Sequence, residues 1–181
     1  MEDKLLLQFN SDVAKDSTEI RIAFYANIGF FIEVVQMLEF NLRKLLCYEL
    51  AVTEIEQSAL TKDALVAVCK KYNEYYKSTY LEKWTLGGLK SKFKKSFSIN
   101  ANAQVTLKEI NDYRNQLVHK IFQNNVISEK LRDSSTVRRY IEERLVPMTN
   151  KAVEVNKFVI KMIVLYGDDL HFYKQQMGIN E

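Results

Sequence analysis

An arginine, an asparagine and a histidine are grouped in one segment whose other residues are largely apolar. Asn115 directly follows Arg114, and His119 stands five residues after the arginine. A histidine side chain titrates near neutral pH and is suited to proton transfer, whereas a guanidinium presents a planar fork of N–H donors to phosphoryl oxygens. Together these side chains suit the cleavage of a phosphodiester without a metal ion.

The segment that carries these residues is predicted to be a helix. Thr106 and Glu109 have the spacing of a capping box, in which a hydroxyl and a carboxylate satisfy two amide donors at a helix start. This spacing predicts that the helix begins near Leu107. Asn111, Asn115 and His119 follow at intervals of four residues, so they form a polar stripe along one face of the helix.

Arg114 projects onto the apolar side of the same helix, about 40° from Ile110. A guanidinium buried there needs a carboxylate or an anionic ligand, because an unpaired buried charge costs several kcal/mol. Glu33 and Glu39 are the candidate carboxylates. The alternative is that both side chains face water and neither pairs with Arg114. Arg114 and His119 lie about 140° apart around an ideal helix and do not share a face.

The composition of the chain favours helices. Its 181 residues include 5 Gly and 1 Pro, too few for the turns of an all-β protein of this length. The hydrophobic share of 47% and the charged share of 27% are those of a globular domain. The net charge of +3 is too small to indicate nucleic-acid binding by itself.

The first half of the chain predicts one long helix. Asp16 and Glu19 again have capping-box spacing, and the apolar pattern then continues to about Leu50. No charged residue occurs between Ile22 and Ile32, a run shorter than a membrane span. A helix that is apolar nearly all round is buried on two sides, either at the centre of a bundle or against another subunit.

Two further helices are predicted on either side of the Arg/His segment. One covers Asp63 to Tyr80, and the last begins near Ser134 or Ser135, is kinked at Pro147 and ends at Gly167. We therefore expect an all-α, up-and-down four-helix bundle with a short extra helix. The predicted organisation is one domain over residues 1–181, with a core of about 17–167 and flanking tails at 1–15 and 168–181.

A short basic segment follows the helix-breaking pair Gly87-Gly88. Its lysines alternate with Phe93 and Phe97 and are Lys90, Lys92, Lys94 and Lys95. Lysines can hold a phosphate backbone while an aromatic ring stacks on a base, so the segment is a candidate RNA-binding surface. The alternative is a solvated lysine-rich face that the phenylalanines anchor to the core.

No metal or cofactor site is predicted. Cys47 and Cys69 stand in helical patterns without a CxxC spacing and read as small buried hydrophobic residues. The chain has no Gly-rich phosphate loop and no HExxH motif. The Leu5-Leu6-Leu7 run is too short for a signal peptide, so we expect a cytoplasmic protein with no membrane segment.

The pattern Arg-x-x-x-x-His from Arg114 to His119, with Asn115 after the arginine, resembles the active-site motif of the HEPN superfamily. These are small all-α domains, many of which are metal-independent ribonucleases of toxin–antitoxin, CRISPR and phage-defence systems. The long first helix with the run from Gln36 to Arg43 supports the resemblance. Its specific part covers six residues, and its architectural part covers most of the chain.

The resemblance implies an endoribonuclease in which His119 is the acid or base, Arg114 binds the phosphate and Asn115 orients the reacting groups, with Asn111 and Glu39 in support. It implies RNA as substrate, a homodimer in which two motifs face one cleft, and an antitoxin or another regulatory protein as a further partner. The competing hypothesis is a catalytically inactive helical module that binds RNA, a nucleotide or a partner protein.

Overall fold

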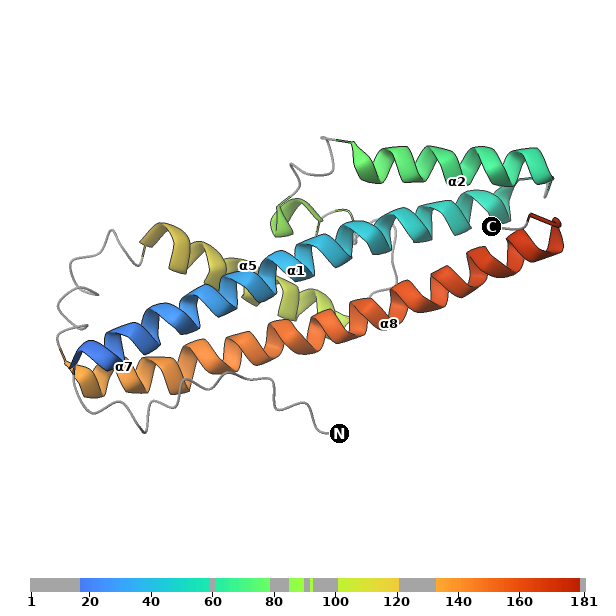
Figure 1. Ribbon diagram of the computed structural model, residues 1–181. Helices are drawn as coiled ribbons and strands as arrows, with labels where there is room; N and C mark the ends of the chain where they lie inside the picture. The colour runs from blue at the N-terminus through green and yellow to red at the C-terminus, as the bar shows by residue number, and fades with distance from the viewer. Residues whose placement is uncertain are drawn as a thin grey trace. The chain divides into compact units, whose positions relative to one another are not determined.

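The computed structural model describes residues 17–58, 61–78, 85–89, 92, 101–120 and 133–179. Within these ranges the regular structure is helical and contains no strand, which confirms the all-α prediction (Figure 1). The elements are α1 (Ser17–Gln57), α2 (Lys62–Lys77), α5 (Ala101–Lys120), α7 (Ser134–Tyr140), the π-helix η1 (Ile141–Leu145) and α8 (Val146–Gln176).

The chain divides into two compact units, and α1, α5 and α8 each contribute to both. Unit 1 comprises Met1–Gln36 and Glu109–Val153, and unit 2 comprises Met37–Lys108 and Glu154–Glu181. Each unit has buried apolar residues of its own.

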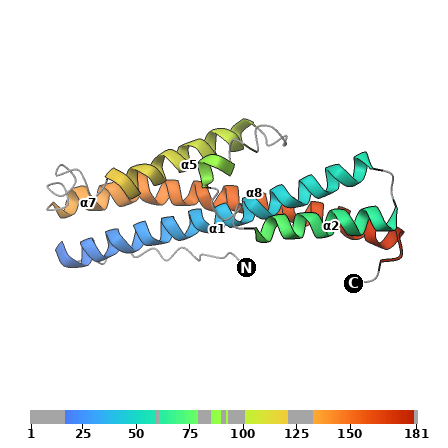
Figure 2. The ribbon, with the colours of Figure 1, turned by 90° about the horizontal axis from the view of Figure 1, so that it is seen from above.

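Unit 1 is built from the first half of α1, the second half of α5 and the segment from α7 to the start of α8. Figure 2 shows α5 running beside this last segment. Aromatic contacts join the three: the ring of Phe31 meets Tyr113 edge-on at 5.3 Å, and the hydroxyl of Tyr113 lies 3.1 Å from that of Tyr140. Lys151 on α8 also forms an ion pair of 2.7 Å with Glu109 on α5.

The predicted distortion near Pro147 occurs, but it takes the form of a π-helical turn. Asp133 caps α7 by accepting hydrogen bonds from the amides of Ser135 and Thr136. It also accepts bonds from the hydroxyls of Thr136 and Ser135, and these side-chain bonds are the main cause that lowers its pKa to about 2. The helix then widens over Ile141–Leu145 immediately before the proline. Since proline lacks an N–H and its ring clashes with the preceding turn, a local change of helical pitch accommodates it without ending the helix.

Unit 2 packs the second half of α1 against α2 and the second half of α8. Ala51 and Ile55 of α1 form a buried cluster with Leu65 and Val68 of α2. Partly buried residues that pack on this cluster come from α2 and from the end of α8 and include Cys69, Tyr72, Leu170, Tyr173 and Met177. A hydrogen bond of 2.8 Å between Asn41 and Asn156 adds a polar contact between α1 and α8.

Glu39 stabilises a short helical turn in unit 2. Residues 86–89 are helical, with Leu86 and Leu89 fully buried. The amide of Leu86 donates a hydrogen bond of 2.7 Å to Oε1 of Glu39. The predicted break at Gly87-Gly88 is therefore wrong, because the two flanking leucines bury their side chains and a carboxylate from α1 satisfies an amide at the start of the turn.

Two predicted helix boundaries are also wrong. α5 begins at Ala101, and the hydroxyl of Thr106 donates to the carbonyl of Asn102 inside the helix and does not cap its start. α8 continues through Gly167 to Gln176, so residues 168–176 are not a tail. The cost of a helical glycine, about 1 kcal/mol, is offset by the burial of Leu170 and Tyr173 on the unit 2 core.

The length and composition of α1 also satisfy the requirements of a membrane span. Its most apolar 18-residue window has a mean hydropathy of 1.3, and 39% of that window is buried. The core helix of a soluble protein meets the same requirements.

Replacement of Glu39 tests the cap. We expect Glu39→Ala to lower the free energy of unfolding by about 1–3 kcal/mol, because the buried amide of Leu86 loses its acceptor. Glu39→Gln retains an acceptor oxygen and should lose less. Urea denaturation measures both, and Glu33→Ala, on the exposed side of the same helix, is the control. An equal effect of Glu39→Ala and Glu33→Ala would contradict the cap.

Candidate functional site

Arg114, Asn115 and His119 lie on α5 within unit 1. The core-facing positions of this part of the helix are Ile110, Tyr113 and Leu117, all buried. Arg114 and Asn115 are half-buried, and His119 is exposed. The prediction that these side chains stand on a helix is confirmed. Arg114 is less buried than its projection suggested, because it lies at the edge of the apolar face.

The side chain of Arg114 forms no hydrogen bond or ion pair within the described part of unit 1. The candidate carboxylate on the same unit, Glu33, is exposed and is not joined to it. The other candidate, Glu39, belongs to unit 2, where its carboxylate accepts the amide of Leu86. Glu39 is thus a helix cap, and its expected role as the partner of Arg114 is not supported.

The stripe of Asn111, Asn115 and His119 differs in exposure along its length. Asn111 is half-buried like Asn115, whereas His119 is open to solvent. Val118 beside them is also open, with an exposed fraction of 43%. The ring of His119 has no hydrogen-bond partner among the described residues, and its orientation is therefore not fixed by them. This part of α5 therefore presents a partly buried guanidinium at the edge of its apolar face and, on the neighbouring stripe, two partly buried amides and a solvent-accessible imidazole.

The backbone beneath this face is held firmly. Tyr113, next to Arg114, is buried between Phe31 and Tyr140, and burial raises the pKa of its hydroxyl. Glu109 is tied to Lys151 on α8. These contacts fix the direction in which α5 presents Arg114 and Asn115.

The predicted lysine surface falls mostly outside the described residues. Lys90, Lys94 and Lys95 are not among them, whereas Lys92 is helical and exposed. The role of these lysines in binding RNA stays a prediction.

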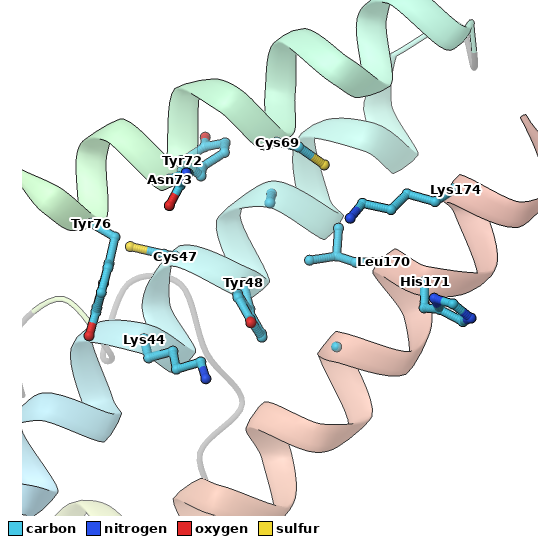
Figure 3. A pocket seen from close by; sticks show the side chains of 12 residues that line it. Lys44, Cys47, Tyr48, Cys69, Tyr72, Asn73, Tyr76, Leu170, His171 and Lys174 are labelled. Atoms are coloured by element: carbon cyan, nitrogen blue, oxygen red, sulfur yellow. The ribbon is translucent and has the colours of Figure 1, made fainter. Parts of the chain in front are cut away.

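A second region with chemical character, a cleft in unit 2, was not identified from the sequence. Its volume is about 450 Å³, and α1, α2 and α8 form its walls (Figure 3). We call it the unit 2 cleft; its lining residues are Lys44, Cys47, Tyr48, Ala51, Cys69, Tyr72, Asn73, Tyr76, Gly167, Leu170, His171 and Lys174. Tyr72 and Tyr76 stand four residues apart on α2 and so share one helix face, but the other walls come from distant segments of the chain.

The two cysteines lie in this cleft as protonated thiols. Burial raises the pKa of Cys47 to about 12. Burial also raises the pKa of Cys69, an effect that the nearby Lys174 opposes. Neither thiol is activated as a nucleophile, since activation requires a lowered pKa. Their predicted role as packing residues is consistent with this environment.

Glu49 is an ionisable group buried in unit 2. Its side chain is 7% exposed, and its Oε2 has no hydrogen-bond partner among the described residues. Burial raises its pKa to about 7, and a hydrogen bond with Tyr166 opposes the rise. The carboxyl group is therefore protonated in the folded chain at mildly acidic pH and ionised above neutrality.

Comparison with protein-family models, with curated proteins and with solved structures gives no match.

Because its pKa is raised in the folded chain, Glu49 is predicted to lower the free energy of unfolding as pH rises. The unfolded carboxyl ionises near its model value of 4.5 and the folded one near 7, so ionisation favours the unfolded chain from about pH 4.5 upward. The penalty is complete above pH 7 and amounts to about 3 kcal/mol. Glu49→Gln removes it.

Urea denaturation at pH 4 and pH 8 measures this effect. We expect the variant to gain stability relative to the unmodified chain at the higher pH and to lose that advantage at the lower one. Glu74→Gln, an exposed change on α2, is the control. A difference between Glu49→Gln and the unmodified chain that does not vary with pH would contradict the raised pKa.

Proposed function

We propose that the chain is a HEPN-type endoribonuclease that cleaves RNA without a metal ion. The observation that carries the proposal is the half-buried Arg114, which has no carboxylate partner in the described part of unit 1, five residues before the exposed His119 on the same helix. A partly desolvated guanidinium without a protein counter-ion is suited to an anionic ligand. Phosphodiester oxygens are ligands of this kind.

The chemistry assigned to these residues is proton transfer and charge stabilisation. A base removes the proton of a ribose 2′-OH, and the oxygen attacks the adjacent phosphorus. The bond to the 5′-oxygen breaks as that oxygen takes up a proton, which leaves a 2′,3′-cyclic phosphate and a 5′-hydroxyl. His119 serves as the base or the acid, Arg114 stabilises the charge on the phosphoryl oxygens, and Asn115 orients the reacting groups.

The proposed assembly is a homodimer of HEPN-like four-helix bundles with a short extra helix. One chain supplies one Arg/His motif, and the reaction gains from both an acid and a base, so two motifs facing one cleft complete the site. Exposed apolar side chains in unit 1 support this arrangement: Ile22 is 54% exposed, Tyr25 50% and Val118 43%. Asn111 and the lysines of residues 90–95 then help to hold the RNA.

The proposed setting is the cytoplasm, with an antitoxin or another regulatory protein as a further partner. These assignments follow the resemblance of the Arg114–His119 motif to the HEPN superfamily, whose members include toxins and defence effectors.

The second candidate function is a catalytically inactive module that binds RNA, a nucleotide or a partner protein. The absence of an orienting partner for His119 among the described residues favours it, because a catalytic histidine is normally held in position by a hydrogen bond to its other ring nitrogen. The ribonuclease hypothesis requires the second subunit or the RNA to supply a hydrogen-bond partner for His119. The inactive binding module requires no such partner.

Cleavage of RNA in the presence of EDTA tests the enzyme. We expect His119→Ala and Arg114→Ala each to reduce the rate by about 100-fold or more, since each removes a group that acts in the transition state. Arg114→Lys keeps the charge without the planar fork and should recover part of the rate. The products should carry 5′-hydroxyl and cyclic phosphate ends.

Gln116→Ala is the matched control for these variants, because Gln116 is an exposed residue of the same helix outside the Arg/His face. Circular dichroism verifies that each variant is folded. Cleavage that survives both His119→Ala and Arg114→Ala, or the absence of cleavage by the unmodified chain over a panel of RNAs, overturns the ribonuclease.

Light scattering at micromolar concentration tests the dimer. We expect twice the mass of one 21.2 kDa chain. Ile22→Glu and Val118→Glu each place a charge on the proposed interface and should shift the protein toward monomer. Val164→Glu changes a comparably exposed apolar residue of unit 2 and should leave the dimer intact. A monomer before any substitution contradicts the composite site.

A further inference from the structure

We propose that the unit 2 cleft binds a nucleoside phosphate, whose phosphate is attracted by Lys44 and whose base packs against tyrosine rings. Neither Arg114 nor His119 lines this cleft. The binding is therefore independent of the ribonuclease activity proposed above, and the failure of one leaves the other standing.

The charges that line the cleft are all basic. Lys44 extends from α1 near Tyr48, and Lys174 extends from α8 near Leu170 at the other end of the cleft (Figure 3). His171 adds a ring nitrogen at the α8 side, held by a contact of 2.8 Å with Gln175. No aspartate or glutamate is among the lining residues. The Lys44 ammonium is a charge partner for a phosphate monoester, which carries about −1.5 to −2 at neutral pH.

Glu54, the carboxylate bonded to Tyr72, is not among the residues that line the cleft. Oε2 of Glu54 accepts hydrogen bonds from Lys71 at 2.6 Å and from the hydroxyl of Tyr72 at 2.7 Å. These bonds, first that of Lys71, lower the pKa of Glu54. The charge of Glu54 is thus balanced by the ammonium group of Lys71.

The tyrosine walls are fixed before any ligand arrives. The ring of Tyr72 is anchored through its hydroxyl on Glu54, and the ring of Tyr76 packs edge-on against Phe40 at 5.9 Å. Lys44 lies 5.5 Å from the centre of the Tyr48 ring. Asn73, between Tyr72 and Tyr76 in sequence, offers both donors and an acceptor to the edge of a base. Rings held in this way bind planar ligands at little cost in side-chain ordering.

The cleft is large enough to hold a base and a phosphate. A volume of about 450 Å³ falls within the range of about 300–1,000 Å³ usual for small-molecule sites. Gly167 forms part of the α8 wall, and a Cβ added there would lie 3.6 Å from the Tyr48 ring, an ordinary contact. An alanine therefore fits at this position, whereas a larger side chain must enter the cleft or displace Tyr48.

Calorimetric titration of the full chain with AMP, GMP, CMP and UMP tests the proposal, with inorganic phosphate and adenosine as partial ligands. We expect saturable binding of at least one nucleotide, tighter than that of either partial ligand. Lys44→Gln should weaken it by about tenfold or more, because a charge-assisted contact is lost. Gly167→Leu should abolish it by filling the cleft.

Gly167→Ala and Lys62→Gln are the matched controls and should bind as the unmodified chain does. Protection of the Cys69 thiol from alkylation by the same nucleotides gives a second readout located in the cleft. If Gly167→Leu does not fold, Lys44→Gln and the protection of Cys69 decide the outcome.

Three results overturn the proposal: no saturable binding of any nucleotide, binding of inorganic phosphate as tight as that of the nucleotides, or nucleotide binding that Lys44→Gln and a folded Gly167→Leu leave unchanged. Loss of RNA cleavage in Arg114→Ala with nucleotide binding retained would show that the two sites act separately.

Discussion

The buried stripe of α1 is the constraint on which both units depend. The helix has 41 residues and is about 60 Å long at 1.5 Å per residue, far longer than one small core can cover. Its first half buries Phe24 and Phe31 in unit 1, and its second half buries Leu42 and Ile55 in unit 2. A single apolar helix therefore serves two cores, which explains why its apolar pattern extends over so many residues.

Two buried carboxylates on α1 illustrate how differently such groups are accommodated. Glu39 accepts a backbone amide and thereby makes a short helical turn possible around the Gly87-Gly88 pair. Oε2 of Glu49 has no partner among the described residues, and burial raises the pKa of this carboxyl group, which favours its neutral form. The first carboxylate organises the fold, and the second makes the stability of unit 2 sensitive to pH.

The sequence predicted the elements better than their ends or their neighbours. The apolar periods and the serines at the start of α7 located the helices, because burial and capping act over short distances in the chain. The helix start predicted from Thr106 was wrong, because its hydroxyl bonds to a carbonyl within the helix. The helix end predicted at Gly167 was also wrong, because packing on the unit 2 core stabilises α8 beyond this glycine. The cap on Leu86 and the unit 2 cleft were beyond prediction, because each joins residues far apart in sequence.

The two candidate sites differ in what the chain itself provides. The walls of the unit 2 cleft are positioned by contacts within one unit, such as Tyr72 on Glu54 and Tyr76 on Phe40. On α5 the backbone is fixed, but His119 is exposed without an orienting partner among the described residues. Because catalysis requires groups held in a productive geometry, a ribonuclease built on this face needs a second subunit or the bound RNA to order the histidine. The proposed dimer would supply that order before RNA binds, whereas a monomer would depend on the RNA itself.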